Sequence, residues 1–231
     1  MSQIKTTDKQ KRSMLGHYFT NKNANFTAVE DSVFVANLSE PEQEKADATN
    51  LSLIDLSTSE RIGFKGADTP DWLKSLKIEL PQEPNTSLQL NEDTIVAKLS
   101  ANEYLFLSYP GKTSEICNKL AKSWQLQPGR LCYRLERDHS HCCFAITGKY
   151  YPQMMAKLCG VDLSPAQFPL NHVAQTSVAR TNSIVIHTKL NNIDSLLLLS
   201  DSASAEYIYQ CLLDAMIEFS GKEVGINAII S

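Results

Sequence analysis

The sequence has no apolar run of the roughly 18 residues that a membrane-spanning helix needs, and its longest apolar stretches, 142–146 and 196–199, are strand-sized. Its polar start lacks the hydrophobic segment of a secretory signal. Positive charge is scarce too, because 22 Lys and Arg stand against 26 Asp and Glu, a net charge of -4. Nucleic-acid-binding domains usually concentrate positive charge, which argues against that class. We therefore expect a soluble, cytoplasmic protein.

Several motifs of cofactor and nucleophilic chemistry are also missing. The sequence contains no GxGxxG or GxxxxGK[ST] phosphate-binding loop and no GxSxG nucleophile elbow. None of the six cysteines forms a CxxC pair, and we expect all six to be reduced thiols. Asp138, His139 and Cys143 are close in sequence, but strand geometry does not bring such neighbours into a catalytic hydrogen bond. We expect no catalytic residue in this chain.

The densest set of potential metal ligands lies in one short stretch. An extended chain would place His139, His141 and Cys143 on one face and Cys142 on the other, so a fourth ligand would have to come from elsewhere. The loop spacing typical of zinc sites is absent as well. A strand with one buried and one polar face explains the pattern better, and we expect no metal site.

Residues 1–50 differ in composition from the rest of the 231-residue chain, in which 42% of residues are hydrophobic. Lys5, Lys9, Lys11 and Arg12 give a mildly basic start, and 39–50 is charged with almost no apolar residue. Only 26–38 has some strand character. The composition is typical of a polar arm or a loosely attached lead-in, which is either an inert tail or a clamp for a partner.

From residue 51 onward the chain repeats the order of its elements. An alternating run over 51–64, a short helix around Trp72, two strand-like runs at 94–99 and 103–108, and a helix near 116–124 form a first unit, 51–130. A run over 141–147, a short helix around Met154, a run at 173–186 with a break near Asn182, a run at 195–200, and a helix over 203–219 form a second unit, 131–231.

Matching residues support a duplication. Gly66 and Gly148 are 82 residues apart, and Pro81 and Pro165 are 84 apart. The pattern predicts an α+β fold of two β-α-β-β-α units related by a pseudo-twofold axis, their sheets packed together and their helices outside. Chance similarity between α/β segments is the alternative.

The run VAQTSVAR at 173–180 places polar groups among small side chains. Its amide at Gln175 and guanidinium at Arg180 suit a partner's carboxylate or a tightly packed seam. An internal salt bridge from Arg180 to Asp162 or Asp201 is equally compatible. We take Gln175 and Arg180, together with His139 and His141, as candidate interface residues.

The stretch LCGVDLSPAQFPLNHVAQTSVAR at 158–180 resembles the gamma subunit of heterotetrameric sarcosine oxidase. The family's Cys-x-x-Asp-Leu segment, its Phe-Pro and its Ala-Gln-Thr run with a following basic residue are matched here by Cys159, Asp162, Leu163, Phe168, Ala174, Gln175, Thr176 and Arg180. DLSTSERIGFKG at 55–66 and AKLSANEYLFLS at 97–108 look like the family's first-half strands. The likeness covers roughly 51–220.

The resemblance implies the fold of the folate-binding aminomethyltransferase (T-protein) superfamily. It also implies a complex with alpha, beta and delta subunits that oxidatively demethylates sarcosine using FAD, FMN, NAD and tetrahydrofolate. In that complex the gamma subunit packs against the folate-binding part of alpha and binds no cofactor itself. The alternative is a stand-alone tetrahydrofolate-dependent aminomethyltransferase-like protein, although the Lys-Gly-Cys segment of the folate-dependent repair relatives is missing at Gly148-Lys149.

Overall fold

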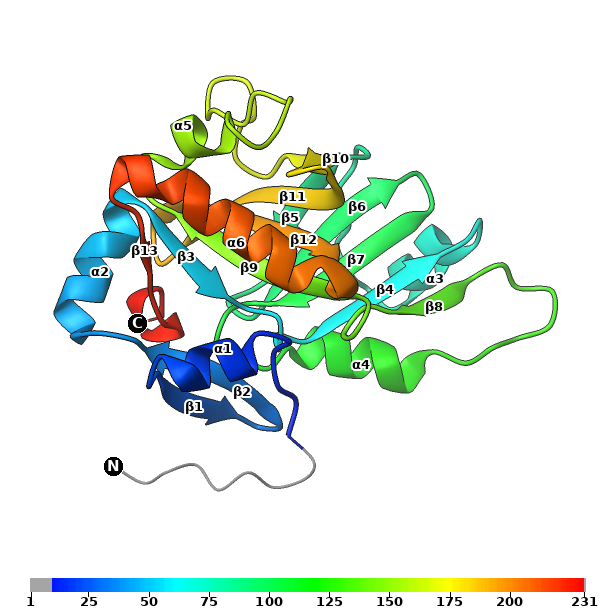
Figure 1. The fold of residues 1–231 in the computed structure, drawn as a ribbon. Coiled ribbons are helices and arrows are strands. Elements are labelled where there is room, and N and C mark those ends of the chain that lie inside the picture. Colours follow the sequence, from blue (N-terminus) through cyan, green and yellow to red (C-terminus); the bar gives the residue numbers. More distant parts are fainter. Residues whose placement is uncertain (1–9, 231) are drawn as a thin grey trace.

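The structure is a computed structural model that describes residues 10–230, within which six α-helices and three β-sheets are found (Figure 1). The α-helices are α1 (Gly16–Asn21), α2 (Pro41–Asn50), α3 (Thr69–Ser75), α4 (Glu115–Ser123), α5 (Tyr151–Met155) and α6 (Ala205–Met216). Short 3₁₀ helices are η1 (Ser202–Ser204), η2 (Ile217–Phe219) and η3 (Ile226–Ala228). None of the helices in this part of the chain has the length and apolar character needed to cross a membrane.

The strands form one hairpin and two larger sheets. The hairpin joins β1 (Asn25–Val29) and β2 (Ser32–Asn37). A five-stranded sheet has the order β5-β6-β7-β4-β8, with β4 (Arg61–Lys65), β5 (Thr86–Gln89), β6 (Thr94–Ser100), β7 (Glu103–Ser108) and β8 (Tyr133–Glu136). A six-stranded sheet has the order β10-β11-β12-β9-β3-β13, with β3 (Ser52–Asp55), β9 (His141–Thr147), β10 (Val173–Val178), β11 (Thr181–Leu190), β12 (Ile193–Asp201) and β13 (Lys222–Glu223).

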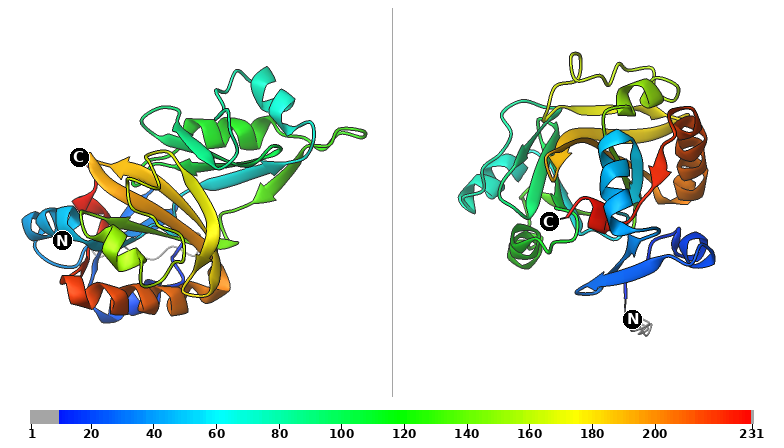
Figure 2. Two further views of the ribbon diagram at one scale, coloured as in Figure 1. Left: turned by 90° about the horizontal axis from the view of Figure 1, so that it is seen from above. Right: turned by 90° about the vertical axis from the view of Figure 1, so that its left-hand side faces the viewer.

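The two sheets face each other across a shared core, and helices cover their outer faces. Along β12, Leu197 and Leu199 point into this core, whereas Leu196 and Leu198 point toward α6, as the two-residue period of a strand requires. Figure 2 shows the five-stranded sheet with α3 and α4 to one side, and β10–β12 with α6 to the other. The predicted α+β class, with packed sheets and outer helices, is confirmed.

Both units contain more strands than the sequence indicates. The break expected in the run 173–186 is present but lies slightly earlier, at Ala179 and Arg180, which both have positive φ (47° and 63°) and turn the chain in a two-residue hairpin. In the first unit, β5 lies between the short helix and the run at 94–99, where the sequence indicates no strand. The run 51–64 also divides, into β3 and β4, which belong to different sheets.

The two units exchange a strand. β3 precedes β4 in the chain but pairs with β9, while β8 precedes β9 but pairs with β4. The orders β5-β6-β7-β4-β8 and β10-β11-β12-β9-β3 therefore correspond strand by strand, which agrees with a duplicated scaffold. The predicted boundary at residue 130 therefore does not separate the two sheets. β3, before this boundary, belongs to the six-stranded sheet, and β8, after it, belongs to the five-stranded sheet.

Residues 10–50 differ from a loosely attached arm. They form α1, the β1–β2 hairpin and α2, and they bury Phe19 and Phe34, of which Phe34 enters the core between the sheets. Glu44 is 1% exposed, and its carboxylate accepts hydrogen bonds from the backbone N–H groups of Leu38, Ser39 and Gly225. Because Glu44 is a charged residue, the sequence of α2 looks polar although this side chain is buried. Lys5 and Lys9 lie outside the described residues.

All six cysteines are free, as the sequence predicts. Cys142 and Cys143 lie on opposite faces of β9, one under α6 and one in the core between the sheets. Burial raises the pKa of Cys142 to about 12 and that of Cys143 to about 11, so both thiols are protonated at neutral pH.

Candidate functional site

An open cleft of about 470 Å³ lies at the end of the six-stranded sheet where β9 begins. Small-molecule sites commonly have volumes of about 300–1,000 Å³. Residues of four strands line the cleft, namely His141, Gln175, Thr176, Ser177, Asn182, Ser183, Ile184 and Leu199. The lining therefore consists of neutral hydrogen-bonding groups beside two apolar side chains.

The cleft is the polar continuation of the core between the sheets. Gln175 pairs with Ile184, and Ile184 pairs with Leu199, so the three residues form one row across β10, β11 and β12. The next row inward, beginning with Val173, is buried in the core that both sheets share. A change from apolar to polar residues along one strand face thus creates the opening.

Gln175 joins the two units beside this cleft. Its Nε2 donates hydrogen bonds to Oδ1 of Asn85 at 2.8 Å and to the carbonyl oxygen of Leu99 at 2.6 Å. The neighbouring backbone adds a further link, since the N–H of Val173 donates to the carbonyl oxygen of Asn85 at 2.9 Å. The tight packing predicted at Gln175 therefore occurs within the chain, between its two units. A role of Gln175 in an interface with another subunit remains a prediction.

His141 is the one titratable group among the lining residues. Burial, with Arg137 and Arg61 nearby, lowers its pKa to about 4, so the imidazole is neutral at pH 7. Its Nδ1 lies 2.7 Å from Oγ of Ser140. A neutral imidazole can both donate and accept hydrogen bonds, which matches the uncharged character of the cleft.

Beneath the cleft, Arg61 holds together the two segments that cross between the sheets. The residue is 3% exposed. Its guanidinium donates to the carbonyl oxygens of Ser57 at 3.0 Å, and of Asp138 and His141 at 2.9 Å each. Its backbone N–H also donates to Oδ1 of Asp138 at 2.6 Å. The β3–β4 and β8–β9 connections are thereby tied to one cation.

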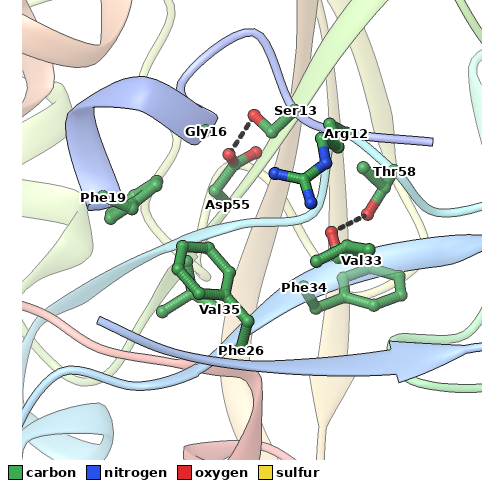
Figure 3. Close-up of a pocket in the computed structure, with 10 residues that line it drawn as sticks. All are labelled: Arg12, Ser13, Gly16, Phe19, Phe26, Val33, Phe34, Val35, Asp55 and Thr58. Carbon is green, nitrogen blue, oxygen red and sulfur yellow. Dashed lines mark hydrogen bonds between the residues drawn. The ribbon is translucent and has the colours of Figure 1, made fainter. Parts of the chain in front are cut away.

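A second cavity, of about 20 Å³, lies under the N-terminal segment and is too small for an organic ligand (Figure 3). Asp55 lines it, is buried, and accepts hydrogen bonds from the hydroxyl of Ser13 and the backbone N–H of Ser57. Burial raises the pKa of Asp55 above its ordinary value, although these hydrogen bonds and Arg61 act against the shift. Lys11 forms a second tie, to Asp138 at 2.7 Å. The cavity thus marks where residues 11–13 fasten onto the crossing segments.

The four predicted interface residues are not gathered at one place. Gln175 and His141 line the cleft, whereas His139 lies exposed in the turn before β9, off the strand face expected for it. Arg180 is exposed at the tip of the β10–β11 hairpin, and within residues 10–230 it forms no ion pair with Asp162 or Asp201. Among the described residues, no group of three His, Cys, Asp or Glu side chains is placed to hold a metal ion.

Sequence reasoning missed the polar cluster under the cleft. Asp55 and Arg61 interrupt the apolar alternation of 51–64, and a charged residue inside such a run is a signal of buried pairing. Their partners are backbone carbonyls and hydroxyls of distant segments, which no spacing in the sequence reveals.

The comparisons with known proteins bear on the fold. No family model and no curated protein matches the chain. A chain of heterotetrameric sarcosine oxidase from Corynebacterium sp. U-96 is similar in structure, with a TM-score of 0.66 and 18% identity over 91% of this chain and 97% of that one. Aminomethyltransferase T of the glycine cleavage system from Bartonella henselae is also similar, with a TM-score of 0.72 and 15% identity over 93% of this chain.

These similarities define the class of fold, which is that of the aminomethyltransferase-like proteins. The chain spans 59% of the length of the aminomethyltransferase and nearly the whole length of the sarcosine oxidase chain. The resemblance noted in the sequence at 158–180 is thus matched by the fold of the described residues.

Proposed function

We propose that this chain is a gamma-type subunit of a heterotetrameric sarcosine oxidase-like complex, without a reaction centre of its own. The observation that carries the proposal is the similarity to a chain of such an oxidase over 97% of that chain. The motif at 158–180 supports the same assignment. In the proposed complex the chain packs against the folate-binding part of the alpha subunit, and the alpha and beta subunits hold FAD, FMN, NAD and tetrahydrofolate.

The surface is compatible with a docking role. Large apolar side chains are exposed along α6, namely Tyr207 (52%) within the helix and Ile217 (73%) directly after it. Exposed apolar groups on one surface commonly mark a protein interface.

The alternative is a stand-alone tetrahydrofolate-dependent protein. The similarity to aminomethyltransferase T supports this alternative. Such a protein needs a carboxylate at the base of a channel between the units, to bind the pterin ring. The eight residues that line the cleft include no carboxylate and no Lys or Arg. This set of hydrogen-bonding groups does not fit a pterin with an acidic tail, and we assign no folate chemistry to it.

Purification of the tagged chain from the cells that make it tests the proposal. We expect it to co-purify with larger flavin-containing chains in equal amounts, and sarcosine oxidation to be lost on deletion of this chain and restored by its re-expression. A purified chain that oxidises sarcosine unaided, or a complex equally active without it, would contradict the proposal. Calorimetry of the isolated chain with tetrahydrofolate addresses the alternative, which micromolar binding would favour.

A further inference from the structure

Strand β8 leaves one edge of the five-stranded sheet open. β8 pairs with β4 on one side, and within residues 10–230 no strand or bridge pairs with its other side. The N–H and C=O groups along a free edge can pair with another chain. The segment 124–132, between α4 and β8, projects beyond the sheet next to this edge (Figures 1 and 2).

Apolar side chains gather on the same segment. Leu126, Leu131 and Tyr133 are 68%, 49% and 47% exposed, and they are three of the eight large hydrophobic residues exposed in the described chain. All three lie within eight consecutive residues that end in β8. Exposed apolar groups beside an unpaired edge favour addition of a strand there.

The charged residues of β8 favour one kind of partner strand, a second copy of β8 itself. The side chains of Arg134 and Glu136 lie on one face and are joined by an ion pair with Nε to Oε1 at 2.9 Å. In an antiparallel pairing of β8 with a second β8, centring on Arg134 or on Glu136 would set like charges opposite each other. Centring on Leu135 instead sets each Arg134 opposite a Glu136 of the other copy. Opposite charges stabilise such cross-strand pairs.

We propose that two copies of this chain associate through antiparallel pairing of their β8 strands about Leu135, with Leu126 and Leu131 extending the contact. The interface is isologous, so each copy contributes the same residues. It is separate from the contact with larger subunits proposed above, and it adds a self-pairing edge to the chain. Because four residues per strand bury little area, we expect a weak dimer.

Analytical ultracentrifugation of the isolated full chain, from about 1 μM to about 1 mM, tests this proposal. We expect reversible dimerisation that Arg134→Glu alone and Glu136→Arg alone each weaken at least tenfold, because each change sets like charges opposite across both symmetric pairs. An equimolar mixture of the two variants should dimerise again, since each variant now complements the other. Lys45→Glu, in an exposed ion pair on α2, is the matched control and should leave dimerisation unchanged.

A second variant does not depend on charge. Leu135→Cys should form a disulfide between copies under mild oxidation, at a rate that the added Arg134→Glu change lowers. The proposal is overturned if the chain is monomeric throughout the concentration range, or if the mixed charge variants fail to restore association while circular dichroism shows both to be folded. Neither outcome affects the co-purification test, so failure here is distinguishable from failure of the proposed function.

Discussion

Arg61 and His141 are joined across the two crossing segments, since Nη2 of Arg61 donates to the carbonyl oxygen of His141 at 2.9 Å. The same nitrogen reaches the carbonyl oxygens of Ser57 and Asp138. A buried cation with several partners is held firmly, but it is costly to leave unpaired. The buried Arg61 guanidinium, next to the cleft, thus stabilises the two segments that cross between the sheets.

Arg61→Lys should lower the free energy of unfolding by about 3 kcal/mol, because a single ammonium group cannot reach all the carbonyl oxygens that the planar guanidinium satisfies. Urea unfolding followed by circular dichroism measures the change. Arg130→Lys is the control, at a half-buried position over the Trp72 ring, and should change the free energy by less than about 0.5 kcal/mol. Equal effects of the two substitutions would contradict the anchoring role of Arg61.

Gly148 allows close approach of β9 and the end of α2. Its φ is +94°, and a Cβ at this position would lie 2.5 Å from the carbonyl carbon and oxygen of Asn50. Gly148→Ala should therefore destabilise the fold by about 3 kcal/mol, combining backbone strain with a backbone clash. A Cβ at Gly160 meets no atom within 4 Å, so Gly160→Ala should be nearly neutral. Thermal unfolding of both variants makes the comparison; similar melting temperatures would refute it.

His141 should make stability depend on pH between its unfolded pKa of 6.5 and its folded pKa of about 4. In that range the unfolded chain binds the additional proton, so the free energy of unfolding contributed by His141 is present above pH 6.5 and is lost as the pH falls toward 4. His141→Gln should flatten this part of the profile relative to the wild type. Urea midpoints measured at several pH values show the difference, and His139→Gln serves as an exposed control. Parallel wild-type and His141→Gln profiles would exclude the effect.

Gln175 should couple energetically to Asn85, because its Nε2 donates to Oδ1 of Asn85 at 2.8 Å across the seam between the units. Gln175→Ala should cost about 1 kcal/mol, and the double-mutant cycle with Asn85→Ala should give a coupling energy of about 0.5 kcal/mol or more. Asn182→Ala is the control, since its side chain lines the same cleft and forms no hydrogen bond with another of residues 10–230. If the effects of the Gln175 and Asn85 substitutions on the free energy of unfolding are strictly additive, this hydrogen bond between the units contributes nothing to stability.

The sequence by itself determined the elements whose residues carry a regular pattern. The four-residue spacing of Ile116, Leu120 and Trp124 predicts α4, and Ile208, Leu212 and Ala215 predict α6, because one apolar face of a helix recurs at that period. The order of elements around Gly66 and Gly148 likewise showed the duplication. The helices depend on residues close together in the sequence, and the duplication is the same local order of elements occurring twice.

Only the tertiary structure decided which strand pairs with which. The sequence predicts a single strand-like run over 51–64, yet β3 and β4 lie in different sheets, because a two-residue period is the same whichever sheet buries the strand. The polar composition of 39–50 hid α2, since the buried Glu44 obtains its hydrogen bonds from Leu38, Ser39 and Gly225. The partners of Arg61, and the meeting of Gln175 with Asn85, depend on contacts between distant segments, and long-range contacts leave no periodic trace in the chain.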